Sequence, residues 1–157
     1  MENVFTVNKE KVIFRCIPPS VTLALRRSIL RPHLSLKKCR HEGDTHAETR
    51  HFGAYEKGEL IGVASVFKAL PPNRDQSDAW RLRGMAVSEK ARKGGIGGKL
   101  LTHCIDYVYT QNGNIFWCYA RTTTILFYEK YGFKIGGEAF DFPQAGPVTL
   151  MIKPIIR

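Results

Sequence analysis

The sequence predicts a mixed α/β fold in which helices flank one central sheet, and three observations support this. The chain has 157 residues, of which 43% are hydrophobic and 24% charged, so we expect one ordinary globular domain over residues 1–157. Runs rich in β-branched and aromatic residues alternate with runs whose apolar residues recur at helical spacing. A glycine-rich segment, residues 94–98, lies between a predicted strand and a predicted helix.

The first half of the chain is predicted to form three strands and one helix. Residues 11–17 are rich in β-branched and aromatic side chains and predict a strand, and residues 20–30 carry an imperfect helical stripe. Residues 32–50 are polar and aperiodic and predict a long loop. Residues 51–55 and 60–67 predict a hairpin, because the turn between them contains Gly58.

The second half begins with a polar, proline-rich loop and continues with alternating strands and helices. Strands are expected at 80–87, at 115–120, from 133 onward and at 148–152, and helices from Gly95 to about 111 and over 122–130. The resulting order, β-α-β-β-β-α-β-α-β-β, is typical of helices packed around one sheet.

The charge of the chain favours anionic partners. The net charge is +10, from 24 basic and 14 acidic side chains, and residues 1–40 alone contribute +7. Such a surface attracts polyphosphates, nucleic acids or anionic lipids. The basic residues of the first 40 positions lack the interleaved aromatic side chains of a single-strand binder, which argues against nucleic acid.

The cysteines and the apolar runs indicate a reduced, cytoplasmic protein. The four cysteines, Cys16, Cys39, Cys104 and Cys118, have no close spacing, so we expect neither a metal site nor disulfides. No apolar run approaches the roughly 18 residues of a membrane span. The first residues lack the basic and apolar regions of a signal peptide, and we therefore expect no membrane association.

The glycine-rich segment predicts a phosphate-binding turn. Glycines let a ligand approach the backbone closely, and the first amides of the following helix carry a partial positive charge. A Walker A motif fails here because Lys93 replaces its first glycine and Leu100 follows Lys99. A dinucleotide fingerprint that starts at Gly95 fails as well. The residues expected at the phosphate are Arg92, Lys93, Gly94, Gly95, Ile96, Gly97, Gly98 and Lys99.

Two motifs resemble those of the GNAT superfamily of N-acetyltransferases. Arg92, Gly95 and Gly97 match the R-x-x-G-x-G pattern of that family's acetyl-CoA pyrophosphate loop. About 30 residues later, the segment 125–133 is similar to its F-Y-x-x-x-G-F signature. The resemblance is strongest over residues 80–135 and implies a mostly antiparallel sheet with one splayed pair of parallel strands. It also implies acetyl-CoA as co-substrate and no metal.

The resemblance assigns roles to residues on both sides of the splayed pair. Met85, Ala86 and Val87 would bind the pantetheine arm through their backbone, and Tyr128 would protonate the departing thiolate. Arg121 stands where the family often has asparagine, so its contact with the cofactor departs from the common pattern.

The strand at 80–87 contains an interruption that the residues themselves predict. Trp80 and Leu82 share one face, but Met85 and Val87 are out of phase with them. One extra residue near Arg83 and Gly84 would restore the phase, which predicts a β-bulge.

Less is determined about the amine side of the site. His51, at the start of its strand, is the first candidate for the general base and Glu56 the second, whereas His103 belongs to the cofactor helix, away from the chemistry. Arg26, Arg27 and Arg83 could bind an anionic substrate, or simply be solvated at the surface.

We therefore expect an acetyl-CoA-dependent N-acetyltransferase in which the amine of a small molecule or a protein attacks the thioester directly. The alternative is a CoA-binding or regulatory module without turnover. A homodimer is possible on these grounds.

Overall fold

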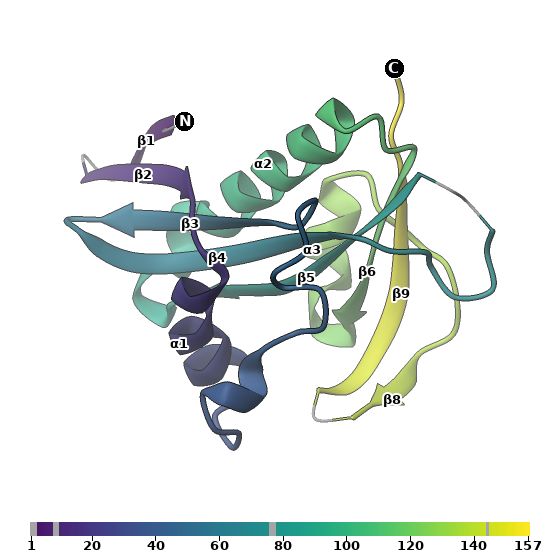
Figure 1. The fold of residues 1–157 in the computed structure, drawn as a ribbon, viewed down its shortest axis with the longest axis horizontal. Helices are drawn as coiled ribbons and strands as arrows, with labels where there is room; N and C mark the ends of the chain where they lie inside the picture. The colour runs from purple at the N-terminus through teal and green to yellow at the C-terminus, as the bar shows by residue number, and fades with distance from the viewer. Residues whose placement is uncertain (1–2, 8–9, 76–77, 144) are drawn as a thin grey trace.

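The computed structural model describes residues 3–7, 10–75, 78–143 and 145–157, and they contain a single mixed sheet (Figure 1). Its strand order is β1-β2-β3-β4-β5-β6-β9-β7, with β8 paired to β9. All neighbours are antiparallel except β5 and β6, which are parallel. The strands are β1 (Asn3–Val7), β2 (Glu10–Cys16), β3 (Arg50–Glu56), β4 (Glu59–Lys68), β5 (Ala79–Val87), β6 (Ile115–Arg121), β7 (Lys134–Ile135), β8 (Phe140–Phe142) and β9 (Gly146–Pro154).

The helical segments lie on both sides of this sheet. Figure 1 shows α1 below the sheet and α2 above it, and we call the two sides the α1 face and the α2 face. The segments are η1 (Pro19–Thr22), α1 (Leu23–Leu25), η2 (Arg26–Leu30), η3 (Lys37–Cys39), η4 (Glu89–Gly94), α2 (Ile96–Thr110), η5 (Thr122–Thr124) and α3 (Ile125–Lys130). None of the helices in the described part of the chain is long and apolar enough to cross a membrane.

The main core lies on the α2 face. There the apolar stripe of α2, including Leu100, Leu101 and Cys104, packs against Trp80 and Phe116 of the sheet. A smaller cluster on the α1 face joins Val63 and Ala86 to the apolar side chains of the first helical run. Both faces are therefore covered by helical segments, as the sequence pattern predicted.

Most elements agree with the predicted ones, and the differences have local causes. The helix predicted over 20–30 winds successively as a 3₁₀, an α and a π segment. The loop predicted over 32–50 is irregular apart from η3. The strand predicted from 133 is only two residues long, while β1 and β8 were not expected. β8 forms because Phe140 and Phe142 pack against Tyr119 while their backbone pairs with β9.

The predicted bulge is present in β5. Val63 pairs with Ala86 and Ser65 pairs with Arg83, so two steps along β4 correspond to three along β5. Gly84 lies in the bulge with φ of +68°, a left-handed conformation that favours glycine. As a result Trp80 and Leu82 before the bulge, and Met85 and Val87 after it, all pack into the core of the α2 face.

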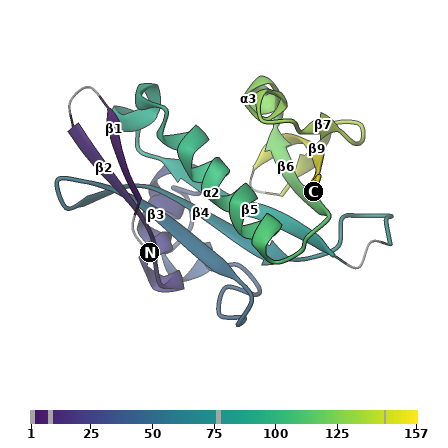
Figure 2. The ribbon, with the colours of Figure 1, turned by 90° about the horizontal axis from the view of Figure 1, so that it is seen from above.

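The parallel pair separates after three residue pairs. Ala79, Trp80 and Arg81 pair with residues 115–117 of β6, and the pairing stops there although β5 continues to Val87. Figure 2 shows the two strands diverging from this common start. The splayed strand pair expected from the sequence is therefore confirmed.

Candidate active site

The diverging end of β5 leads directly into the glycine-rich turn. After Val87 the chain forms η4, and α2 then begins at Ile96. Gly95 precedes the helix with φ of +77°, and Lys99 donates the first intrahelical hydrogen bond to its carbonyl at 3.1 Å. No described side chain caps this helix end, so the amides of Ile96, Gly97 and Gly98 have no acceptor within the helix. These amides and the helix dipole suit an anionic group such as a phosphate.

Gly97 and Gly98 differ in what an added side chain would contact. A Cβ at Gly98 would overlap the hydroxyl of Tyr131, so glycine is required there by the packing of α3 on α2. A Cβ at Gly97 would only make ordinary contacts, 3.6 Å to Phe127 and 3.8 Å to Val87. The fold itself therefore does not require glycine at position 97, whereas a ligand that approaches its amide would.

The basic side chains around the turn are exposed. Arg92 donates from Nε to the carbonyl of Val87 at 3.3 Å, which ties the turn to the end of β5. Lys93 and Lys99 are also exposed. The structure thus brings together all the residues that the sequence assigned to the phosphate turn, next to Met85, Ala86 and Val87.

Tyr128 lies on the other side of the splay. It belongs to α3 and packs against Phe127 and Phe133, with ring centroids 5.1 and 5.6 Å away. Burial, with the nearby thiols of Cys118 and Cys104, raises the pKa of the Tyr128 hydroxyl, which therefore keeps its proton at neutral pH. Cys118 follows the last β6 residue that pairs with β5, so Tyr128 lies where the two strands begin to diverge.

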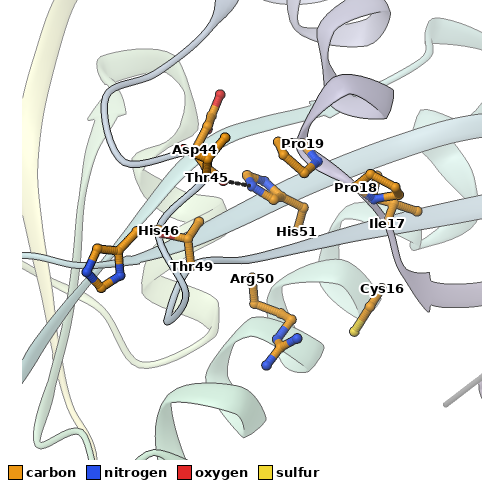
Figure 3. A pocket seen from close by; sticks show the side chains of 10 residues that line it. All are labelled: Cys16, Ile17, Pro18, Pro19, Asp44, Thr45, His46, Thr49, Arg50 and His51. Carbon is orange, nitrogen blue, oxygen red and sulfur yellow. Dashed lines mark hydrogen bonds between the residues drawn. The ribbon is translucent and has the colours of Figure 1, made fainter.

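His51 is buried on the α1 face, and both of its ring nitrogens are bonded. Nε2 lies 2.9 Å from the carbonyl of Asp44, drawn as the dashed line in Figure 3, and Nδ1 lies 2.6 Å from the hydroxyl of Ser65. Because a carbonyl only accepts, Nε2 carries the proton and Nδ1 accepts from Ser65. Burial lowers the pKa of His51, which favours this neutral ring.

The two candidate bases are far apart. His51 and Glu56 lie at opposite ends of β3, which separates them by about 17 Å at the usual rise of a strand. A pocket of about 360 Å³ lies beside His51, lined by Cys16, Pro18, Asp44 and His46 among others (Figure 3). This pocket belongs to the β2–β3 edge of the site, away from the splay between β5 and β6.

Arg26 holds the long loop onto the sheet. Its guanidinium pairs with both oxygens of Asp44, at 2.7 and 3.0 Å, and donates to Ser65 and to the carbonyl of Cys39. Arg26 is only 1% exposed. The suggestion that it binds a substrate is thus replaced by a structural role, while Arg27 is exposed and donates to the carbonyl of Leu34.

Several basic residues gather on the α1 face of the splay, and two of them, Arg31 and Arg81, were not singled out in the sequence. The guanidinium carbon of Arg81 lies over the rings of Trp117 and Tyr119, 5.0 and 5.2 Å from their centroids. Arg121 and Arg31 both donate to the carbonyl of Leu30, each at 3.2 Å. No local pattern could have revealed this group, because its members come from four separate segments.

Arg83 and His41 complete the group. Burial and the charges of nearby arginines lower the pKa of Arg83 to about 10. The same causes lower the pKa of His41 to about 3, so its ring is neutral at pH 7. The described residues contain no cluster of three His, Cys, Asp or Glu side chains that could hold a metal.

Comparisons with known proteins agree with this geometry. Residues 47–135 match the model of the acetyltransferase (GNAT) domain. The chain is 36% identical over 135 residues to the uncharacterized N-acetyltransferase YitI of Bacillus subtilis (strain 168), covering 85% of this chain and 90% of that protein.

Solved structures share the fold at low sequence identity. An aminoglycoside 6'-acetyltransferase type Ii has a TM-score of 0.71 and 21% identity, over 92% of this chain and 97% of that one. An aminoglycoside 6'-N-acetyltransferase complexed with coenzyme A has a TM-score of 0.67 and 18% identity, over 92% and 97% of the two chains. The matched domain model and the relative from B. subtilis identify the chain as an acetyltransferase of the GNAT family.

Proposed function

We propose that this chain, as one domain, transfers the acetyl group of acetyl-CoA to an amine by direct attack within a ternary complex. The observation that carries the proposal is the course of β5. The strand diverges from β6, bulges at Gly84 and runs into a helix start whose first amides have no acceptor within the helix and no cap from a described side chain. One strand thus connects a phosphate-binding turn with the place where two reactants can meet.

The residues of this chain fit a CoA-type molecule. The amides of residues 96–98, with Arg92, Lys93 and Lys99 around them, would hold the pyrophosphate. The contacts at Gly97 leave room for close approach, and one structural neighbour was solved with coenzyme A. The bound thioester would supply the acetyl group, and the backbone of Met85, Ala86 and Val87 would hold its arm. Arg121, whose guanidinium donates to Leu30 on the α1 face, was also expected at the cofactor.

The proton inventory of the reaction is simple. A bond forms between the amine nitrogen and the acetyl carbon, and the bond from that carbon to sulfur breaks. The amine loses one proton, and Tyr128 supplies another to the departing sulfur. Its raised pKa keeps that proton available at neutral pH. His51 remains our candidate for the group that receives the amine proton. Because Nε2 donates to the carbonyl of Asp44 and Nδ1 accepts from Ser65, the proton would reach Nδ1 through the Ser65 hydroxyl.

The test is release of free thiol from acetyl-CoA in the presence of single amines. Steady turnover with at least one amine, together with a mass gain of one acetyl group on that amine, would support the proposal. Tight binding of acetyl-CoA without turnover on any amine would instead indicate a CoA-binding or regulatory module. Failure to bind acetyl-CoA at all would contradict both functions.

A further inference from the structure

We propose that the acceptor is an amine that also carries an anionic group, a carboxylate or a phosphate, and that Arg83 binds this group together with Arg31 and Arg121. This inference rests on the proposed acetyl transfer, because it concerns the second substrate of the same site.

Arg83 lies at the bulge, on the face opposite the cofactor helix. It pairs across the sheet with Ser65, which in turn pairs with His51, so the three side chains lie on the same face. That face is the α1 face, since Ser65 is bonded to Arg26 of η2. The glycine-rich turn follows the far end of β5, beyond Val87. A group bound by Arg83 would therefore reach the splay from the side opposite α2.

Arg31 and Arg121 are held next to each other although both are cations. Arg31 Nη1 and Arg121 Nη2 donate to the same carbonyl, that of Leu30, so these two nitrogens are separated by no more than twice 3.2 Å. Burial and the charge of Arg121 lower the pKa of Arg31. The positive charge of Arg31 in turn lowers the pKa of Arg83. Arg31 thus lies next to Arg121, and its charge also reaches Arg83 at the bulge.

The charge of this group is not balanced by the protein. Asp44 is the carboxylate whose charge raises the pKa of Arg83, but Arg26 already pairs with both oxygens of Asp44. Within the described residues, Arg83 makes no hydrogen bond or ion pair with any side chain or carbonyl. A half-buried guanidinium among like charges is unfavourable, and an anion bound between them would relieve the repulsion.

Buried polar atoms without partners surround the same place. Arg26 Nε, His41 Nε2 and Arg81 Nε are buried and have no hydrogen-bond partner among the described residues. Two of them, Arg26 Nε and His41 Nε2, lie 2.9 and 3.3 Å from the position that a Cβ on Gly84 would take. Such atoms are rare in folded proteins, and when they cluster they indicate a site for a polar ligand.

The chemistry of the ligand follows from that of arginine. A guanidinium presents its donors as a planar fork that matches a carboxylate or a phosphate. Tyr119, which is partly exposed and lies beneath Arg81, offers an aromatic edge to the apolar part of the acceptor, whereas Trp117 is buried. A polycationic acceptor such as a polyamine would be repelled by the same arginines.

The experiment compares amines that differ only in the anionic group. L-phenylalanine and phenethylamine form one pair, O-phosphoethanolamine and ethanolamine the other, and spermidine is the polycationic probe. Thiol release gives kcat and KM for each amine with the wild-type protein and with Arg83→Gln. Arg27→Gln is the matched control, because Arg27 is exposed on η2 and donates to Leu34 outside the group.

We expect the anionic member of at least one pair to be preferred by about 10-fold or more in kcat/KM, and the preferred pair identifies carboxylate or phosphate. Arg83→Gln should raise KM for that amine by about 10-fold, and leave the member without the anionic group within about 2-fold and the Kd for CoA unchanged. Arg27→Gln should change none of these values.

Three results would overturn the inference while leaving acetyl transfer intact. They are preference for the amines without an anionic group or for spermidine, equal losses of both pair members in Arg83→Gln, and a weaker Kd for CoA in that variant, which would assign the arginines to CoA. If no amine is acetylated, the proposed function fails. The inference is then decided by calorimetric binding of L-phenylalanine and O-phosphoethanolamine to the CoA-loaded protein, and absence of Arg83-dependent binding contradicts it.

Discussion

Gly97 offers a test in which stability and ligand binding should change in opposite directions. A Cβ at this position would lie 3.6 Å from Phe127 and 3.8 Å from Val87, which are ordinary contacts, so Gly97→Ala should fold normally. Alanine restricts the unfolded chain more than glycine does, so the free energy of unfolding should rise by about 0.4 to 1 kcal/mol. Affinity for CoA should nevertheless fall, because the added methyl group occupies the approach to the amide.

Gly97→Glu adds a negative charge at the same place. A carboxylate about 5 Å from a pyrophosphate of roughly two charges is repelled by about 1.7 kcal/mol, even at the dielectric constant of water. That energy corresponds to roughly 15- to 20-fold in Kd. Gly137→Glu is the control, because Gly137 lies outside the glycine-rich turn and a Cβ there would meet nothing within 4 Å.

Calorimetry with CoA and thermal unfolding of each variant measure the two effects separately. The reasoning predicts that Gly97→Ala is at least as stable as the wild type and binds CoA more weakly, and that Gly97→Glu binds it more weakly still. Wild-type affinity in both folded Gly97 variants would refute the assignment of this turn to the pyrophosphate.

Four further outcomes are expected. Tyr128→Phe keeps the ring packing but removes the proton donor, so kcat should fall by about 100-fold with unchanged Kd for CoA; wild-type turnover between neutral and mildly alkaline pH would leave Tyr128 with packing alone. Burial raises the pKa of the Cys118 thiol to about 12, so thiolate is scarce at pH 7, and incubation with acetyl-CoA alone should leave the intact mass of the protein unchanged. Rapid gain of one acetyl group at Cys118, followed by its transfer to added amine, would disprove direct attack. The pKa of His41 is about 3 in the folded protein against about 6.5 unfolded, so the unfolded state binds the extra proton and stability is lost as pH falls below about 6.5. Between pH 7.5 and 5.5 the wild type should lose at most about 1.4 kcal/mol more than His41→Gln in urea unfolding, and equal losses would contradict the shift. If His51 is the base, His51→Gln should lower kcat by about 100-fold. Stability should fall in either case because both ring nitrogens are bonded, so an unchanged kcat would leave His51 only its bonds to Ser65 and Asp44.

The sequence by itself determined the elements whose signals are local. The helix over 96–110 was predictable because its buried residues recur at helical spacing, and its start because Gly95 and its neighbours form a recognisable turn. The bulge was predictable as well, since the phase change between Leu82 and Met85 is a property of one strand. Each of these signals lies within about 15 residues, where the backbone period alone relates the side chains to one another.

Only the tertiary structure decided what the α1 face contains. Arg26 looked like Arg27 in the sequence, but Asp44 lies 18 residues further along and buries only the first of them in an ion pair. The short strand β8 likewise depends on the contact between Phe140 and Tyr119, which are 21 residues apart.

The group of Arg31, Arg83 and Arg121 shows the same limit at the candidate site. Successive members of this group are 52 and 38 positions apart, and no period or motif connects them. They meet because η2 packs over the bulge of β5 and because β6 diverges from β5 only after Trp117. The proposed phosphate-binding turn is encoded in neighbouring residues, whereas the surface that would select the acceptor is created by packing distant segments against one another.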